Sequence, residues 1–312
     1  ALIASIEGKR GMPRFRPPYP VESGLWGKPT IINNVETLAA VPWIMNNPGE
    51  YEKTGYANSK GTKVFALAGK IKRGGLVEIP FGMSLRELIF DVGKGIQNDK
   101  NFKAVQIGGP SGGCLPASLL DLRIDYEELK QSGAIVGSGG LVVMDESSCM
   151  VDIARFFLSF TTKESCGKCT FCRVGTKRML ETLEDIVNGR SNDDHLQRLY
   201  ELSDAVSKLS LCGLGQTAPN PVITTLRYFI DEYHSHIKDK RCPAGVCSAL
   251  TKYSIDEQKC VGCMLCKKEC PVSAIVETKR ADGKKICSID SSKCISCGRC
   301  YKVCKFSSVL KR

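Results

Sequence analysis

The sequence predicts a multidomain protein of mixed class, α/β plus α+β, on three observations. Strand-like alternation around one helical segment occupies residues 57–145 and indicates a small β-grasp module. Four segments with helical periodicity follow in residues 146–237 and indicate a four-helix bundle. A cysteine-rich repeat then fills residues 253–312. A Pro- and Gly-rich segment, 1–56, precedes these parts, and residues 238–252 are predicted to form a linker because charge, Pro and Gly break the helical pattern.

The composition favours a globular protein that binds metal in a reducing compartment. Of the 312 residues, 42% are hydrophobic and 25% are charged, which is typical of globular domains. No run of about 18 apolar residues would span a membrane. The 17 cysteines are odd in number and cluster at metal-ligand spacing, so a cytoplasmic location is expected. Only three histidines occur, and no paired carboxylates mark a cleft, which disfavours a hydrolase.

The formal net charge of +11 is partly offset by the metal groups that the cysteines predict. A four-thiolate [4Fe–4S] cluster carries about −2 when oxidised, so three clusters would leave roughly +5. The Lys and Arg residues clustered near the C-terminus would equally well guide an acidic partner. Nucleic-acid binding would need aromatic stacking or zinc-finger spacing, and neither appears. We therefore expect neither a nucleic acid nor a membrane as partner. The N-terminus has no initiator Met and no leader pattern, so we expect a piece of a longer polypeptide.

The first two segments carry clear local signals. "GMPRFRPPYPVESGLWGKP" forces extended or turn conformations, and "NNVETLAAVPWIM" predicts a short helix. In the β-grasp module we expect strands over 62–69, 75–81 and 103–109, and a helix over 84–95. The following "GGPSGG" lacks the G-K-[ST] ending of a phosphate loop, so we interpret it as structural.

The predicted bundle has four amphipathic helices, over residues 150–164, 176–189, 193–209 and 221–237. Between the first two lies "ESCGKCTFCRVG", which places three cysteines at C-x2-C-x2-C spacing. Iron–sulfur cubes require four ligands, and one later cysteine stands at the end of the third helix. We therefore predict a [4Fe–4S] cluster, with Gly213 and Gly215 letting the backbone approach it. Its predicted ligands are Cys166, Cys169, Cys172 and Cys212.

The C-terminal repeat is the most specific signal. "SIDEQKCVGCMLCKKECP" and "SIDSSKCISCGRCYKVCK" match across a shift of about 34 residues. Each has the C-x2-C-x2-C-x3-C run of two-cluster ferredoxins, in which the fourth cysteine ligates the cluster of the other run. Lys305 replaces the second proline of the pattern, and zinc is the alternative metal. The predicted ligands are Cys260, Cys263, Cys266 and Cys304 for cluster one, and Cys294, Cys297, Cys300 and Cys270 for cluster two.

Five cysteines remain outside these three sets. Cys114 and Cys149 are most simply small buried residues. Cys242 and Cys247 form a C-x4-C pair just after His236, and such a pair can hold zinc with a histidine and one further ligand. Two free thiols are the alternative. No role is predicted for Cys287.

Two long motifs carry a family resemblance. "IEGKRGMPRFRPPYPVESGLWGKPTIINNVETL" and "ESCGKCTFCRVG" closely resemble the flavin-bearing, NADH-oxidising subunit of complex I and related soluble hydrogenases and formate dehydrogenases. The added two-cluster ferredoxin domain resembles the beta subunit of electron-bifurcating [FeFe]-hydrogenases and ferredoxin–NAD(P) oxidoreductases. The resemblance implies that 1–56 is the C-terminal part of an FMN- and NAD-binding domain, with a β-grasp module of the soluble-ligand-binding type after it.

The resemblance also implies cofactor contacts and a function. Asn33 and Asn34 would contact FMN, and Arg16 and Tyr19 would contact NAD(H) or NADP(H), with Tyr19 stacking on adenine. The family's flavin loop and nicotinamide-facing glutamate lie upstream, so no catalytic residue is expected in this chain. The implied function is a subunit of a soluble, electron-bifurcating NAD(P)H-linked oxidoreductase that relays single electrons to ferredoxin or a hydrogenase-type subunit, beside a thioredoxin-like [2Fe–2S] subunit. The alternative is an electron-relay scaffold without substrate turnover.

Overall fold

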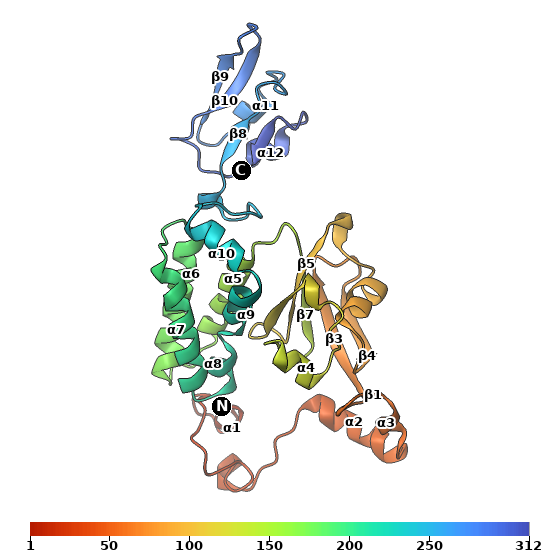
Figure 1. Ribbon diagram of the computed structural model, residues 1–312. Coiled ribbons are helices and arrows are strands. Elements are labelled where there is room, and N and C mark those ends of the chain that lie inside the picture. The colour runs from red at the N-terminus through yellow and green to blue at the C-terminus, as the bar shows by residue number, and fades with distance from the viewer. Residues whose placement is uncertain (312) are drawn as a thin grey trace.

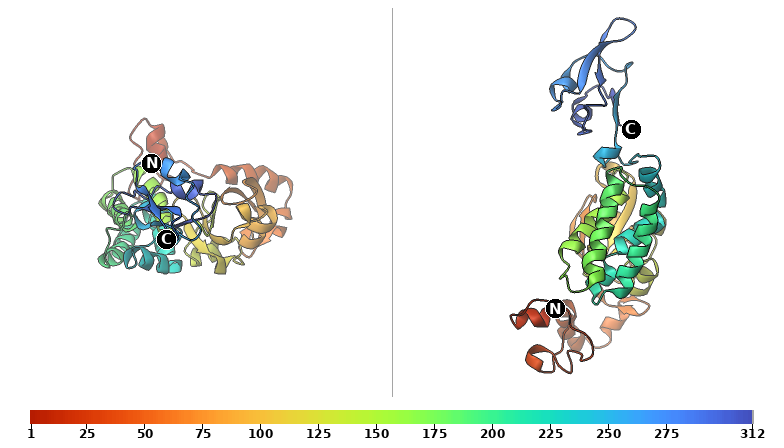
Figure 2. Two further views of the ribbon diagram at one scale, coloured as in Figure 1. Left: turned by 90° about the horizontal axis from the view of Figure 1, so that it is seen from above. Right: turned by 90° about the vertical axis from the view of Figure 1, so that its left-hand side faces the viewer.

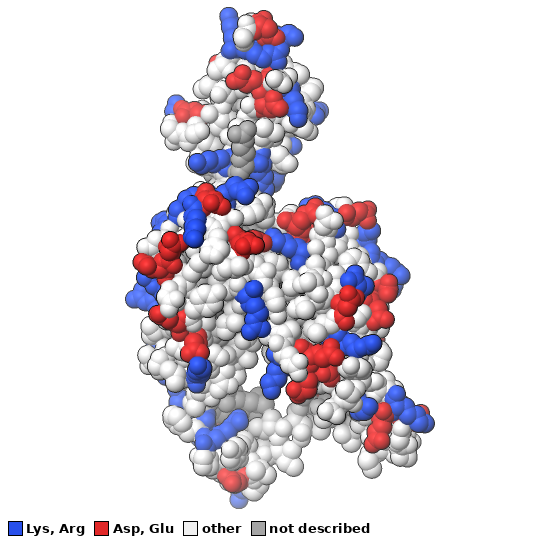
Figure 3. Space-filling view, in the orientation of Figure 1, with Lys and Arg blue, Asp and Glu red and all other residues white. Residues whose placement is uncertain are grey.

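The computed structural model describes residues 1–311 and shows four parts (Figure 1). A helical bundle and a sheet module lie side by side, the N-terminal segment runs beneath both, and the C-terminal domain stands beyond the opposite end of the bundle (Figures 1 and 2). Among the described residues, no helix is long and apolar enough to cross a membrane. On the face shown in Figure 3, cationic and anionic side chains are interspersed over the bundle and the sheet module.

The N-terminal segment has little regular structure, as its prolines dictate. Its helices are α1 Leu2–Ile6, η1 Leu25–Gly27, α2 Val35–Asn46 and α3 Glu50–Lys53, and a small hairpin follows, β1 Gly55–Tyr56 with β2 Ser59–Lys60. The α2 helix begins where "NNVETL" predicts, because the Asn34 side chain accepts a hydrogen bond from the Glu36 amide at 2.9 Å. Glu36 then pairs with Lys63 of the sheet module, which ties α2 to that module.

The sheet module is a five-stranded mixed sheet of order β4-β3-β7-β5-β6. Its strands are β3 Thr62–Gly69, β4 Gly75–Pro80, β5 Phe102–Ile107, β6 Gly113–Pro116 and β7 Gly140–Asp145; β3 and β7 run parallel and the other pairs antiparallel. Its short helices are η2 Glu87–Val92, η3 Gln97–Asp99, η4 Ala117–Leu119 and α4 Tyr126–Gln131. The three expected strands are present. The expectation of three strands was incomplete, because β6 and the central β7 were missed.

The bundle contains seven helical pieces: α5 Met150–Lys163, η5 Phe171–Gly175, α6 Thr176–Val187, α7 Asp194–Leu209, α8 Gly213–Thr217, α9 Asn220–Tyr228 and α10 Ile230–Ile237. The first three predicted helices correspond to α5, α6 and α7. The fourth is not continuous: the backbone at Phe229 leaves the helical region, with φ −134° and ψ 33°, and splits it into α9 and α10. Buried Leu158, Leu183 and Leu226 lie in one core between these helices.

The bundle and the sheet module share an interface through α9 and β6. The Thr224 hydroxyl of α9 accepts a hydrogen bond from the Cys114 amide of β6 at 2.9 Å. Tyr228 donates its hydroxyl hydrogen to the Ser132 carbonyl at 2.9 Å. Both hydrogen bonds give partners to polar groups that would otherwise be buried without one. The bundle and the sheet module are therefore connected by packing contacts as well as by the chain between them.

The C-terminal domain has two antiparallel pairs, β8 with β11 and β9 with β10. Its elements are β8 Tyr253–Ile255, α11 Leu265–Lys268, β9 Ile275–Lys279, β10 Lys285–Ile289, α12 Arg299–Val303 and β11 Val309–Lys311. The short helices α11 and α12 occupy equivalent places in the sequence repeat. The predicted linker 238–252 includes η6 Ser248–Leu250, and Leu250 is buried in the bundle core.

Candidate metal centres and the loop beside them

Four cysteines of the bundle converge where α5, η5 and α8 meet. Cys166 and Cys169 lie in the loop after α5, Cys172 lies in η5, and Cys212 is the N-cap residue of α8. The Leu211 amide donates to the Cys169 sulfur at 3.4 Å. Burial raises the pKa of the Cys172 thiol, and the neighbouring Cys212, Cys169 and Cys166 raise it further. Four thiols facing one another are the ligand set that a [4Fe–4S] cluster takes.

The two glycines after Cys212 differ in their surroundings. A Cβ on Gly215 would lie 3.2 Å from the Cys172 Cβ and 2.5 Å from the Ser210 Cβ, so Gly215 is required for this close approach. A Cβ on Gly213 would meet nothing within 4 Å. Gly213 lines the hollow next to Cys212, and the expectation that it permits close approach to a cluster stays a prediction.

A hollow of about 710 Å³ separates these cysteines from the proline-rich N-terminal loop. Cys166 and Cys212 line one side, and Phe15, Arg16 and Pro18 line the other. This volume lies within the usual range of roughly 300–1,000 Å³ for small-molecule sites. The loop is anchored to the cysteine segment by two bonds. Arg10 donates to the Cys166 carbonyl at 2.8 Å, and Lys168 donates to the Pro13 carbonyl at 2.6 Å.

The residues that the resemblance assigns to nucleotides do not all reach this hollow. Arg16 lines it, whereas within residues 1–311 Tyr19, Asn33 and Asn34 are not among its lining residues. The Tyr19 ring is exposed, and its backbone amide donates to Glu22 at 2.9 Å. The side-chain oxygen of Asn34 is engaged in capping α2, so its amide NH₂ is the group left to contact a ligand.

The C-terminal cysteines line two separate cavities in the crossed arrangement. Cys260, Cys263, Cys266 and Cys304 surround one cavity, and Cys270, Cys294, Cys297 and Cys300 surround the other. The Ala274 amide donates to the Cys270 sulfur at 3.2 Å, and the Cys287 amide donates to the Cys260 sulfur at 3.5 Å. Amide-to-sulfur bonds of this kind stabilise the negative charge that iron-bound thiolates carry. Each donor set therefore fits a four-thiolate cluster.

Sequence reasoning missed one cysteine at the first of these cavities. Cys287 of β10 lines it together with the four predicted ligands. Burial, with a hydrogen bond to Cys266, raises the pKa of the Cys287 thiol to about 12. A residue-by-residue comparison of the two repeats would have drawn attention to it, because Cys287 stands where the first repeat has Tyr253.

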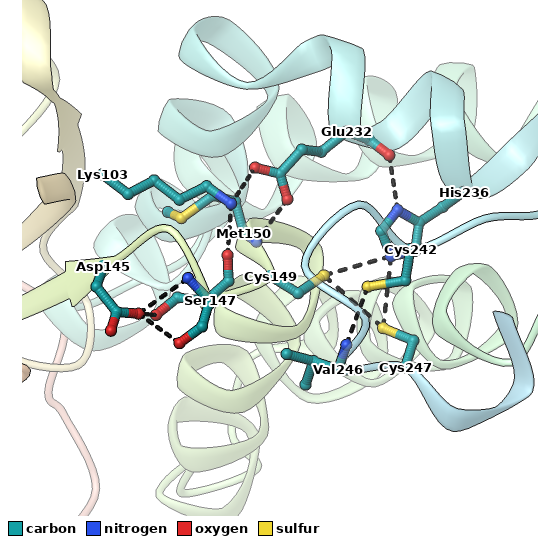
Figure 4. Close-up of polar contacts among 11 residues, drawn as sticks. Lys103, Asp145, Ser147, Cys149, Met150, Glu232, His236, Cys242, Val246 and Cys247 are labelled. Atoms are coloured by element: carbon teal, nitrogen blue, oxygen red, sulfur yellow. Dashed lines mark hydrogen bonds and ion pairs between the residues drawn. The ribbon is translucent and has the colours of Figure 1, made fainter. Parts of the chain in front are cut away.

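A fourth centre brings together Cys149, His236, Cys242 and Cys247 (Figure 4). All four side chains are buried, and their ligand atoms lie within 4.8 Å of one another. The Cys149 and Cys247 sulfurs are 3.7 Å apart, and the His236 Nε2 lies 3.3 Å from Cys149 and 3.4 Å from Cys247. Tetrahedral zinc with bonds of about 2.3 Å to sulfur would place its ligand sulfurs about 3.8 Å apart. The geometry and the donor set both fit zinc.

Outer hydrogen bonds orient this centre. The His236 Nδ1–H donates to the Glu232 carbonyl at 2.7 Å, which leaves the Nε2 lone pair directed at the cysteines. The Val246 amide donates to the Cys242 sulfur at 3.3 Å. Hydrogen bonds from Cys149 and Cys247 lower the pKa of the Cys242 thiol, and the same bonds raise the pKa of the Cys149 and Cys247 thiols. All three thiols must lose their protons when a metal binds.

Cys149 is the member of this group that sequence reasoning missed. It was expected to be a small buried residue, and it is buried, but its sulfur faces the centre. It stands immediately before α5, while the other three residues lie at the end of α10 and in the segment that follows. Only the packing of α5 against α10 brings these distant segments together, so no spacing rule could have identified it.

Comparisons with known proteins agree with this layout. The family model described as NADH-ubiquinone oxidoreductase-F iron-sulfur binding region matches residues 152–236, and that of a 4Fe-4S dicluster domain matches residues 259–308. The NADP-reducing hydrogenase subunit HndC of Solidesulfovibrio fructosivorans is 56% identical over 281 residues, which cover 90% of this chain and 57% of that protein. An F subunit of the NADH-quinone oxidoreductase of Rhizobium meliloti is 39% identical over 244 residues, covering 78% of this chain and 58% of that protein.

A solved structure is also similar. A chain of the NAD+-reducing [NiFe]-hydrogenase in its H2-reduced state matches with a TM-score of 0.69 and 38% identity, over 76% of this chain and 40% of that chain. The chain thus spans between about two fifths and three fifths of the length of the proteins it resembles.

Proposed function

This chain belongs to the family of the NADH-quinone oxidoreductase F subunits and the NADP-reducing hydrogenase subunit HndC, and from that premise we propose that it is an iron–sulfur, NAD(P)H-linked oxidoreductase subunit. It would relay single electrons within a multisubunit complex in a reducing compartment such as the cytoplasm. We further propose electron bifurcation, with ferredoxin or a hydrogenase-type subunit as acceptor and a thioredoxin-like [2Fe–2S] subunit as neighbour.

One observation carries the proposal. The proline-rich loop and the bundle cysteines line the same hollow, with Arg16 on one wall and Cys166 and Cys212 on the other. A flavin nucleotide and a first electron acceptor need such proximity, and the Arg16 guanidinium would attract the phosphates of an anionic nucleotide. FMN, when bound, would exchange a hydride with NAD(P)H and release its two electrons one at a time.

The protein's own residues would have distinct tasks. Cys166, Cys169, Cys172 and Cys212 would hold the cluster beside the hollow, and the two crossed sets of the C-terminal domain would hold clusters one and two. The Asn33 and Asn34 amides would contact FMN, and the exposed Tyr19 ring is free to stack on an adenine. The electron-relay scaffold is the second candidate. It is favoured by the engagement of the Asn34 oxygen in the helix cap.

We also propose that Cys149, Cys242, Cys247 and His236 hold a structural zinc ion. All four ligand positions of a tetrahedral site are supplied by the protein, which distinguishes structural from catalytic zinc. The ion would fasten residues 242–247 to the ends of α5 and α10 and so fix the segment that leads to the C-terminal domain.

Metal and flavin analysis of the full chain, purified without oxygen, tests these assignments. We expect about 12 irons per chain, from three four-iron clusters, and one zinc. Iron near four per chain, or zinc at the cluster positions, would contradict the three-cluster assignment. Full iron content in a native complex that lacks FMN would favour the scaffold.

A further inference from the structure

The two halves of the C-terminal domain differ at two pairs of equivalent positions beside the proposed cluster sites. The cavity of cluster one is lined by Cys287, and the cavity of cluster two is lined by Tyr253. The repeat shift that superposes "SIDEQKC" on "SIDSSKC" places Tyr253 and Cys287 at the same position, each immediately before the shared "SID". The same shift places Met264 opposite Gly298. These four residues are outside the proposed ligand sets.

Within each half, the two residues lie next to each other. One half combines the large Tyr253 with Gly298, and the other combines the small Cys287 with the long Met264. Met264 and Gly298 both precede a short helix, with positive φ of 61° and 72°. A Cβ on Gly298 would lie 2.7 Å from the Tyr253 hydroxyl, so the absence of a side chain admits the ring. In the other half the Met264 sulfur is 3.4 Å from the Cys287 sulfur, so a long side chain meets a short one. The exchange places a thiol where the other half has a phenol.

Cys287 lies against the proposed ligands of cluster one. Its backbone amide donates to the Cys260 sulfur at 3.5 Å, and its thiol, which donates to the Met264 sulfur at 3.4 Å, lines the same cavity as Cys266. Its side chain is only 2% exposed, so water does not compete for the S–H group. A cluster-bound Cys266 is a thiolate and accepts a hydrogen bond better than the neutral Met264 thioether does.

We propose that Cys287 is a positioning and tuning residue of cluster one, whose S–H group on the wall of that cavity turns from Met264 to the cluster-bound Cys266 thiolate and raises the reduction potential of the cluster. One-electron reduction adds a negative charge to the cluster and its thiolates, and a hydrogen-bond donor stabilises the reduced form more than the oxidised one. The inference rests on the proposed assignment of clusters to this domain.

Redox titration of the full chain, followed by paramagnetic resonance under anaerobic conditions, tests the proposal. Cys287→Ala removes the donor and should decrease the reduced-to-oxidised ratio of one C-terminal cluster about three- to tenfold at a fixed potential. That change corresponds to a shift of about 30 to 60 mV for a one-electron couple. Cys287→Ser keeps a donor and should restore most of the potential. Tyr253→Phe, at the matched position, should leave cluster one unchanged.

Iron analysis of the same proteins distinguishes a failure of the proposed tuning role from a failure of the proposed cluster assignment. Both Cys287 variants should keep the iron content of the unaltered chain. A loss of about four irons in Cys287→Ala would make Cys287 a ligand and overturn the tuning role. An unchanged potential in Cys287→Ala, or an equal shift in Cys287→Ser, would also overturn it. Absence of iron from the C-terminal domain of the unaltered chain would instead overturn the proposed cluster assignment.

Discussion

The ion pair between Lys103 and Glu232 connects the sheet module to the proposed zinc centre, and Lys103→Met should loosen that centre. Lys103 of β5 lies 2.7 Å from the Glu232 carboxylate of α10, and the side chains are only 18% and 12% exposed. The other Glu232 oxygen accepts from the Met150 amide at 3.0 Å, next to Cys149. The Glu232 carbonyl holds His236 (Figure 4). One glutamate thus orients the segments of two proposed zinc ligands.

The expected magnitude follows from the burial of the pair. Removing one partner of a fully buried ion pair costs about 3–5 kcal/mol, because the other charge is left uncompensated. The partial exposure of Lys103 and Glu232 reduces this to about 2–3 kcal/mol. Since about 1.4 kcal/mol corresponds to a factor of ten, the centre should open at least about 30-fold more often. Methionine preserves most of the packing of the lysine stem, so lost volume contributes little.

The assay is the rate of zinc release from the full chain to a chromophoric chelator. Lys103→Met should release zinc at least about 30-fold faster, with unchanged iron content. The double variant Lys103→Met with Glu232→Gln should recover most of the loss, because glutamine still accepts from Met150 and no charge is left unpaired. Arg86→Met is the matched control, since its ion pair with Asp121 is exposed and contributes little. Equal release rates in Lys103→Met and Arg86→Met would refute the reasoning.

Two further predictions concern the proposed ligands. Cys149→Ser should lose zinc as completely as Cys242→Ser does while the iron content stays unchanged, which metal analysis checks; zinc retained in Cys149→Ser would remove Cys149 from the centre. In the native complex, Cys212→Ser should slow reduction of the C-terminal clusters by NADH but spare flavin bleaching, whereas Cys304→Ser should affect only the C-terminal domain. Stopped-flow absorbance with paramagnetic resonance measures both, and undiminished transfer in a Cys212 variant shown to lack its cluster would contradict the path.

The sequence predicted those features that depend on short-range spacing. The three-cysteine run before α6 and the two C-terminal runs are short continuous segments, so these candidate ligands can be identified from the chain without the fold. The first three bundle helices follow from 3.6-residue periodicity for the same reason. The break at Phe229 was not visible, because the apolar pattern continues through it. The strand β7 was missed because "GLVVMD" is a short continuous apolar run without alternation, a pattern that periodicity alone does not assign to a strand.

Cys114 and Cys149 are two cysteines whose different roles could not be predicted from the sequence. Both are buried and neither belongs to a spaced run, so the same expectation follows for both from the sequence. In the structure, the Cys114 backbone bonds to Thr224 of α9, whereas the Cys149 sulfur meets His236 and Cys247. The difference arises from which helix each residue packs against. Such a distinction requires tertiary contacts between segments that are distant in sequence.

The same contacts limit the freedom of the C-terminal domain. Residues 238–252 were predicted to form a linker. Instead Cys242 and Cys247 are buried beside α5 and α10, Leu250 is in the bundle core, and Thr251 is only 2% exposed. Between Thr251 and the start of β8 at Tyr253, only the exposed Lys252 remains. Any motion of the domain must therefore occur as rotation about the backbone near Lys252, because the preceding residues are held by packing and, when bound, by zinc.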